Sequence, residues 1–482
     1  MDCRRTRPVV PPTPCNPGAA LRAVASSSRN RPLDAGTNFR TLSPPSPQNN
    51  STFAAAVGIG SNHRPISRRR FRNLLTLGPV IIPARFSHLL RITLSPRAAR
   101  LLAGAVLLVC AVFAAHALFA ALRGVRGEYL AFSDFFAQWS FAWFARMNDV
   151  ARIYNANVLH QFQLTLEPAL RQSFPFPYPP TYLLTIWPLS WLSYGPAYLV
   201  WDIATLALFL WGVLGAKPRM PMLAFVLLAP VTVITLQQGQ NGLLSAALIV
   251  GGLRLMGARP VIAGILLGLA TFKPQLGVLV PLALIGAGAW RTIAAASITA
   301  LLLILATGLV FGWAVWPAWF DAASGHGVWL EQSVSNYLKP SIMANLELAG
   351  ASRWLAHAVQ AGVAAVVAVL VVLCFWRGAT DLSLAALQVG TFLAMPWFFR
   401  YDMPMLANAI LFLVRDRERS ARNFGLIETG IILAGLLFPV VVTLTSRFFY
   451  VSSLSLLLLF GLIVWRRLGP EGRRRHSMIA SC

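Results

Sequence analysis

Long apolar runs, interrupted by short polar breaks that contain glycine or proline, occupy the chain from Leu101 to Trp465. A bilayer core requires roughly 20 apolar residues per helix, and most of the runs approach or reach that length. The pattern predicts an all-α polytopic integral membrane protein with about 12 transmembrane helices. The expected spans are residues 99–122, 196–215, 220–237, 241–257, 260–272, 274–289, 292–312, 352–375, 381–396, 402–414, 424–443 and 447–465.

The polar segments around these runs divide the chain into three regions. Residues 1–90 are rich in Pro, Ser, Arg and Asn and have too few apolar side chains to form a core, which predicts a disordered tail. No short apolar run lies near Met1, so we expect no cleaved signal peptide there. A membrane domain is expected over residues 98–467, and a second basic tail over residues 468–482.

A polar and aromatic stretch from Arg123 to Pro179 follows the first apolar run. It is too long and too charged for a tight turn, so we expect a long first extracytoplasmic loop that contains amphipathic helices. Residues 180–193 are expected to form a short interfacial or re-entrant segment. An additional crossing there would invert the orientation of every later span.

Composition and charge support this membrane assignment. Hydrophobic residues make up 56% of the chain and charged residues only 12%, whereas about a quarter of an ordinary soluble protein is charged. The net charge is +25, and residues 1–100 alone hold 16 arginines and two acids. Basic segments beside a span remain cytoplasmic, so both tails are expected inside the cell and nucleic acid is not the expected partner. The scarcity of lysine among the basic residues indicates a GC-rich coding bias, which is typical of many bacteria. With the apolar spans and basic flanks, we expect a multi-pass protein of the bacterial inner membrane.

The charges between the later spans predict the topology in the same way. Loops rich in arginine should be cytoplasmic, and they contain Lys217, Arg219, Arg254, Arg259, Arg291, Arg377, Arg415, Arg417, Arg419, Arg466, Arg467 and Arg473. The opposite, extracytoplasmic ends then carry Asp134, Gln240, Asn241, Lys273, His326, Asn336, Arg400, Asp402 and Arg447. We therefore expect an active site on the extracytoplasmic face.

Two of these polar residues could carry chemistry. Asp134 lies in an aromatic segment beyond the first span, where a carboxylate could deprotonate a sugar hydroxyl; the alternative is a helix N-cap. Lys273 lies between two apolar segments, immediately before Pro274. A lysine inside a helix bundle usually has a partner or a task, such as binding a phosphate; the alternative is that its ammonium reaches the headgroups.

The remaining candidates each have a structural alternative. Residues 239–242 (Gly-Gln-Asn-Gly) offer the Gln240 and Asn241 amides to a sugar, or form a plain turn. Arg400 and Asp402 could contact substrate, or form an ion pair with each other. His326 and Asn336 share the outer loop 313–350, where a lone histidine is more often incidental.

Several signatures are missing from the sequence. It contains no GxxxxGK[ST] motif, so an ATP-driven motor is not indicated. No Asp-x-Asp pair in the outer loops offers oxygen ligands to a divalent cation, and the five cysteines form no CxxC motif. We expect no metal site and no cofactor. A sugar donor used outside the cell should then already carry a lipid phosphate.

Short motifs occur in a fixed order over about residues 125–410. They are Asp134, residues 139–142 (Trp-Ser-Phe-Ala), Tyr154, residues 178–180 (Tyr-Pro-Pro), residues 187–189 (Trp-Pro-Leu), Trp201, residues 239–241 (Gly-Gln-Asn), Ala263, Gly264, Lys273, Pro274, residues 333–336 (Ser-Val-Ser-Asn), Tyr401 and Asp402. In these motifs the sequence resembles glycosyltransferase family 87, within the GT-C superfamily, and is similar to polyprenyl-phosphate-mannose-dependent mannosyltransferases.

The resemblance implies a GT-C-like fold and an inverting transfer of a glycosyl residue, with mannose the best-known donor sugar, from polyprenyl phosphate to a lipid or glycan acceptor of the envelope. It implies that Asp134 is the catalytic base and that Lys273 lies near the donor phosphate, with Arg400 or His326 as further cations. The segment 178–201 would border the groove for the polyprenyl chain.

Two other classes remain open from the sequence. A secondary transporter also has about 12 spans and polar residues near broken helices, although no repeat relates the two halves of this chain. A non-enzymatic assembly protein for envelope polymers is the third class, and it would not depend on Asp134.

Overall fold

Helices form the ordered part of the chain. The computed structural model describes residues 93–126, 134–216, 218–333, 339–376, 378–420, 423–445 and 449–469, and no strand occurs among them. All of them belong to the unit Leu77–Cys482. The expected tails, 1–90 and 468–482, lie outside the described residues except for their boundary at 468–469.

The all-α prediction is therefore confirmed for the described chain. The α-helices are α3 (Pro96–Val125), α4 (Asp134–Met147), α5 (Ala156–Leu166), α6 (Thr181–Ile186), α7 (Tyr194–Leu214), α8 (Met220–Leu228), α9 (Pro230–Gln238), α10 (Gly242–Leu255), α11 (Pro260–Leu269), α12 (Val280–Ala287), α13 (Trp290–Phe311), α14 (Val315–Ser333), α15 (Ile342–Leu348), α16 (Arg353–Trp376), α17 (Asp381–Ala394), α18 (Pro404–Ser420), α19 (Leu426–Thr445) and α20 (Phe449–Leu468). Short 3-10 helices connect some of them: η2 (Val150–Tyr154), η3 (Trp187–Trp191), η4 (Ala270–Phe272), η5 (Pro274–Gly277) and η7 (Arg400–Asp402).

Six described helices are long and apolar enough to cross a membrane, namely α3, α7, α13, α16, α19 and α20. The helices α8 and α9 pass the same test as a pair bent by 55°. The other five predicted spans fold as the shorter helices α10, α11, α12, α17 and α18. The expected total of about 12 spans is thus not established by helix length, although every predicted span is helical.

Proline explains where many of the short helices begin. It occupies one of the first two positions of α8, α9, α11 and α12, where its missing N–H would have no helical partner. Lys273 precedes Pro274 and has a non-helical backbone, as expected for a residue before proline. The apolar run 260–287 is consequently broken near its middle.

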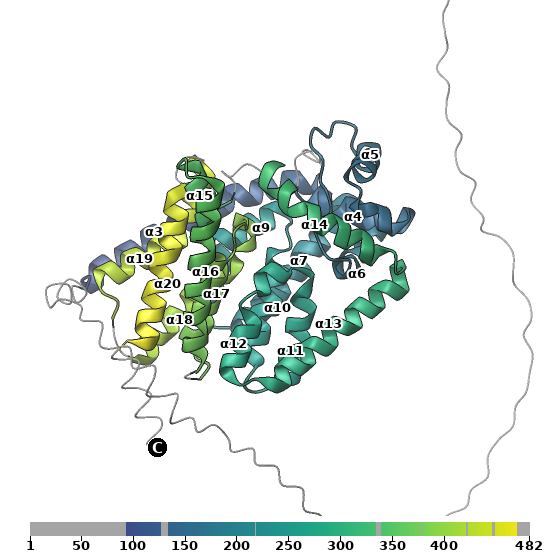
Figure 1. Ribbon diagram of the computed structural model, residues 1–482. Coiled ribbons are helices and arrows are strands. Elements are labelled where there is room, and N and C mark those ends of the chain that lie inside the picture. The colour runs from purple at the N-terminus through teal and green to yellow at the C-terminus, as the bar shows by residue number, and fades with distance from the viewer. Residues whose placement is uncertain are drawn as a thin grey trace, which may run out of the picture. The chain divides into compact units, whose positions relative to one another are not determined.

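The buried helix α10 lies at the centre of the fold (Figure 1). Every side chain from Gly242 to Leu253 is buried, and α10 packs against α7, α11 and α18. On one side α13 covers α11, and on the other α17 packs between α16, α18 and α20. A helix that is apolar on all sides is expected in such an interior position.

The expected long outer loop contains short helices. The helix α4 is mostly buried and packs against α6, η3 and the beginning of α7, so it is more enclosed than an amphipathic surface helix. Residues 180–193 form α6 and η3, which are too short to cross a membrane. Their placement at the membrane surface stays a prediction. The predicted loop 313–350 is also largely helical, as α14 and α15.

The basic loops gather at one end of the fold. Arg219 pairs with Glu418 at 3.7 Å, and the Arg254 guanidinium donates to the Trp211 carbonyl at the end of α7. Arg466 pairs with Asp416 at 3.3 Å. These contacts join the end of α7 and the start of α8 to the last turns of α10, α18 and α20. The cytoplasmic location of this end stays a prediction.

Candidate functional site

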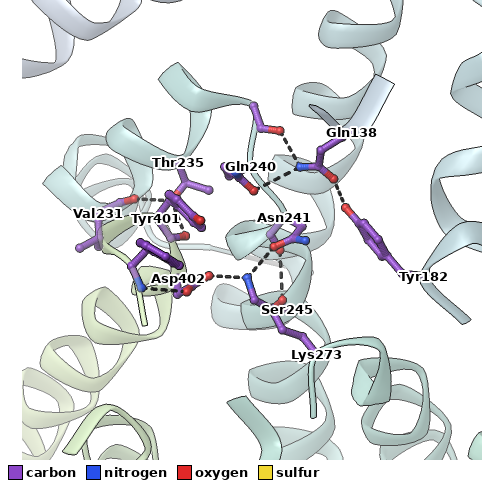
Figure 2. Close-up of polar contacts among 12 residues, drawn as sticks. Gln138, Tyr182, Val231, Thr235, Gln240, Asn241, Ser245, Lys273, Tyr401 and Asp402 are labelled. Carbon is purple, nitrogen blue, oxygen red and sulfur yellow. Dashed lines mark hydrogen bonds and ion pairs between the residues drawn. The ribbon is translucent and has the colours of Figure 1, made fainter. Parts of the chain in front are cut away.

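Three interruptions between short helices meet in the interior of the fold, and each supplies polar side chains (Figure 2). The turn between α9 and α10 supplies Gln240 and Asn241. The break between α11 and α12 supplies Lys273, and the connection between α17 and α18 supplies Arg400 and Asp402. Residues 166 positions apart in the sequence are thereby brought into contact, as in the Thr235 hydroxyl bond to the Tyr401 carbonyl at 3.0 Å.

Lys273 joins all three interruptions. Its ammonium is ion-paired with Asp402 and donates to the Asn241 side-chain oxygen at 2.8 Å. The second carboxylate oxygen of Asp402 accepts the Phe399 backbone N–H at 3.0 Å. Lys273 and Asp402 are each only 3% exposed. Because a buried charge needs a partner, this pair holds the three interruptions in register.

Aromatic rings enclose the ammonium. The Lys273 nitrogen lies 5.9 Å from the Tyr178 ring centre and 5.6 Å from that of Tyr401. Both distances are within the range of cation–π attraction. Tyr178 also packs on Tyr182, with ring centres 4.4 Å apart. Burial raises the pKa of Tyr178, and the negative charge of Asp402 raises it further. Tyr178 is therefore a neutral hydroxyl at physiological pH.

Two glycines permit the close approach of these elements. Gly239 ends α9 with φ +59°, and a Cβ there would lie 2.6 Å from the Phe135 Cβ. At Gly242 a Cβ would overlap the carbonyl oxygen of Tyr401. Positive φ strains other L residues, and neither position has room for a side chain. The four-residue turn 239–242 thus fits between the start of α4 and η7.

A buried network attaches α4 to the same turn. The Gln138 amide donates to the Gly239 carbonyl at 3.0 Å and lies 3.4 Å from the Gln240 side-chain oxygen. The Tyr182 hydroxyl donates to the Gln138 side-chain oxygen. Gln138 and Tyr182 are at most 1% exposed. These bonds fix α4, and with it Asp134, next to Gln240.

Asp134 is the first residue of α4, and its side chain is half-buried. Burial raises the pKa of this carboxyl from 3.8 to about 6, whereas a hydrogen bond from Gln240 and the positive charge of Arg400 act to lower it. At pH 7 the group is therefore mostly ionised and able to accept a proton. A base with a pKa just below the working pH is well suited to proton transfer.

Arg400 supplies a positive charge that no carboxylate fully occupies. Its guanidinium is half-buried and donates to the Thr443 hydroxyl at 2.8 Å. Asp402 pairs with Lys273, so the alternative of an ion pair between Arg400 and Asp402 is wrong. Burial lowers the pKa of Arg400, and the nearby Asp134 carboxylate opposes that effect.

The structure brings together Asp134, Gln240, Asn241, Lys273, Arg400 and Asp402. It places the backbone of His326 in α14, and that side chain is not among those described. Asn336 lies outside the described residues. The headgroup position considered for Lys273 does not fit its burial. Two residues that the sequence did not single out, Gln138 and Tyr182, complete the network.

A signal for these two residues existed in the sequence. Gln138 is a polar residue within an otherwise aromatic helix, and Tyr182 closely follows the Tyr178–Pro180 motif. A polar group among aromatic residues needs a buried partner. Its identity depends on the packing of α4 against α6.

One contact shows where the candidate site lies along α7. The Tyr198 hydroxyl donates to the Leu236 and Gln237 carbonyls at the end of α9. Tyr198 lies one turn after the start of α7, which is about 6 Å along the helix axis. The site therefore lies near one end of α7, which is a candidate membrane span. The helix α10 begins at the site and runs to the basic end of the fold, where Arg254 contacts the end of α7.

Comparison with known families supports an enzyme. Residues 176–397 match the profile of glycosyltransferase family 87. The match covers a little under half of the chain and supports glycosyltransferase family 87. A search of curated proteins found no match, and a search of solved structures found none.

The family 87 region contains Gln240, Asn241 and Lys273 but ends before Arg400, and it begins after Asp134. The folded chain therefore brings side chains of the matched region next to Asp134, which precedes it in the sequence, and to Arg400, which follows it. No group of three or more His, Cys, Asp or Glu side chains that could hold a metal ion occurs within the described ranges.

Proposed function

We propose that this family 87 protein transfers a glycosyl residue, with mannosyl the first candidate, from a polyprenyl-phosphate donor to an extracytoplasmic acceptor of a bacterial envelope. The observation that carries the proposal is the environment of Asp134. A half-buried carboxyl with a pKa of about 6 lies beside the Arg400 cation and the Gln240 amide. That combination offers a base for a hydroxyl and a cation for a phosphate.

In the proposed reaction, an acceptor hydroxyl oxygen attacks the anomeric carbon while its proton passes to Asp134. The bond between that carbon and the phosphate oxygen breaks, and polyprenyl phosphate leaves with the bonding electrons. Attack opposite to the leaving group inverts the anomeric configuration. A phosphate leaves without a general acid, so a single base suffices.

Arg400 is proposed as the direct ligand of the departing phosphate. Its guanidinium is only half-buried and is near Asp134, whereas the Lys273 ammonium is occupied by Asp402 and Asn241. A cation that is already in place stabilises charge as it develops on the leaving group. We propose that Lys273 acts on the phosphate mainly through the electrostatic attraction of its positive charge and by orienting the Asn241 side chain through a hydrogen bond. His326 and Asn336 remain proposed substrate ligands.

The donor lipid is proposed to lie along the segment 178–201. This segment carries exposed apolar side chains, with Trp191 at 55% and Leu199 at 46% exposed. Exposed apolar side chains beside a site near the end of a spanning helix suit a polyprenyl chain that enters from the bilayer. If so, bulky substitutions in this segment should raise the donor concentration required for half-maximal transfer.

The decisive experiment measures transfer of radiolabelled mannose from synthetic polyprenyl-phosphate-mannose to a membrane lipid extract by the purified protein. Asp134→Asn should lower transfer by about 100-fold or more, the contribution expected from a positioned base. Asp149→Asn is the matched control, because Asp149 is an exposed helix cap that asparagine replaces well.

Equal transfer by wild type and Asp134→Asn would remove Asp134 from this role. Absence of transfer by the wild type with every donor tested would favour a transporter or an assembly protein. The site's position near one end of α7, instead of its middle, argues against the transporter.

A further inference from the structure

A polar cavity lies at the opposite end of α7 from the candidate active site. Its volume is about 530 Å³, and the end of α7, the start of α8 and the last turns of α18 form its walls. The lining residues are Leu214, Pro218, Arg219, Met222, Arg415, Glu418 and Arg419. No step of the proposed glycosyl transfer uses them.

This cavity has a surplus of positive charge. Two of its three arginines have carboxylate partners, since Arg219 pairs with Glu418 at 3.7 Å and Arg419 pairs with Asp381 at 2.8 Å. Arg415 has no carboxylate at ion-pair distance among the described residues, and its guanidinium lies 3.8 Å from the Met222 sulfur.

Burial lowers the pKa of Arg415, and the positive charges of Arg419 and Arg219 lower it further, against the effect of Asp381 and Glu418. A half-buried guanidinium without a full counter-charge is an anion site, because its planar donors match the oxygens of a phosphate. The neighbouring Arg254 adds to the positive charge at Arg415.

Apolar side chains extend from the cavity along the outside of the helices. Leu208 is 45% exposed and Trp211 39% exposed on α7, and Met220 is 76% exposed at the start of α8. Both helices belong to candidate membrane spans. A ligand in this cavity can therefore place a phosphate among the arginines and an acyl chain on the surface of α7.

We propose that this cavity is a binding site for the headgroup of an anionic phospholipid, with Arg415 as the central phosphate ligand. Basic cavities between helix ends at a membrane boundary favour such headgroups. The exposed apolar path favours a lipid over free phosphate. A bound phosphodiester would bridge α8, which leads through α9 to Gln240, and α18, which begins after Asp402.

The test uses the full chain purified in a neutral detergent, with bound lipid counted by native mass spectrometry and the unfolding midpoint followed by tryptophan fluorescence. The probes are phosphatidylglycerol, phosphatidylcholine and inorganic phosphate. Phosphatidylglycerol should bind and raise the midpoint, because a ligand specific to the folded state stabilises it. Phosphatidylcholine and inorganic phosphate should have little effect.

Arg415→Gln should weaken phosphatidylglycerol binding about tenfold, the effect of losing one charged hydrogen bond. Arg291→Gln is the matched control, since Arg291 is exposed at the start of α13 and does not line the cavity. Arg419→Gln provides a second variant if Arg415→Gln does not fold. Unchanged binding in these variants would overturn the site, and an equal effect of inorganic phosphate would overturn the lipid as its ligand.

Discussion

At the scale of single residues, the carboxyl of Asp134 determines how the activity should respond to pH. Its pKa is raised by burial to about 6, and the ionised form is the proposed base. Transfer should therefore fall as the pH drops through 6, because protonation removes the base. A profile of kcat/KM between pH 5 and 8 should show one acid limb with a midpoint near 6.

Arg400 provides a check on that assignment. Its positive charge lowers the pKa of Asp134, so Arg400→Gln should move the acid limb to higher pH as well as slowing transfer. If the midpoint of the acid limb is the same in Arg400→Gln as in the wild type, a group other than Asp134 causes the loss of activity at low pH.

The buried pair of Lys273 and Asp402 gives a prediction about stability. Lys273→Met leaves the Asp402 carboxylate buried without its partner, which should cost about 3–5 kcal/mol. The double variant with Lys273→Met and Asp402→Leu removes both charges and should recover most of that loss. The unfolding midpoint in detergent measures both effects.

The double variant also distinguishes packing from chemistry. If the pair serves only to hold the helix breaks together, transfer should recover along with the midpoint. We expect the midpoint to recover and transfer to remain low, because Asn241 would have lost the ammonium that orients it.

At the scale of elements, short helices that end inside the fold are what create the site. The helices α10, α11 and α12 extend from the basic end only as far as the breaks at Asn241 and Lys273. Their free ends would leave backbone groups and side chains unsatisfied in an apolar interior, so the polar residues at the breaks bond to one another. The interruption and the polar cluster therefore depend on each other.

Gly242→Ala tests that arrangement. The added Cβ would meet the Tyr401 carbonyl oxygen and displace η7, which carries Arg400 and Asp402. A displacement of about 1 Å in a catalytic group can reduce the rate about 100-fold. Transfer should fall by roughly that factor, and the unfolding midpoint should fall as well.

The control for this variant is Gly257→Ala. Gly257 follows α10 at its other end, and a Cβ there would have no atom within 4 Å. This substitution should leave transfer and the midpoint nearly unchanged. Equal loss in both variants would mean that the effect of Gly242→Ala does not come from its contact with Tyr401, and the argument would be wrong.

At the scale of the whole molecule, the two ends of α7 should lie on opposite sides of the membrane. Tyr194 at its start packs against Phe135 of α4, with ring centres 5.5 Å apart, and Leu214 at its end lines the basic cavity. The helix has 21 residues. Its length is therefore about 31 Å, close to the thickness of the bilayer core.

Cysteine labelling can measure this orientation. Single cysteines at the exposed positions Arg171 and Gly257 should react with an impermeant maleimide from opposite sides, in right-side-out and inverted vesicles respectively. Cys3, Cys15 and Cys482 would first be replaced by serine, whereas Cys110 and Cys374 are buried. Labelling of both positions from one side would contradict the proposed topology.

The sequence by itself determined the helical class, the approximate bounds of the helices and the grouping of the basic loops. Each of these features follows from a short stretch of sequence, because an apolar run, a proline or a group of arginines sets the local structure without distant contacts. The short motifs within residues 176–397 likewise indicate family 87 without reference to any contact between distant residues.

Only the tertiary structure decided which side chains of the candidate site contact one another. Lys273 with Asp402, and Gln138 with Tyr182 and Gly239, are contacts between elements far apart in the chain. The length of an apolar run does not reveal that α10, α11 and α12 stop inside the fold. Burial, which raises the pKa of Asp134, also comes from packing. Such contacts depend on how all the helices pack at once, and no local pattern encodes that.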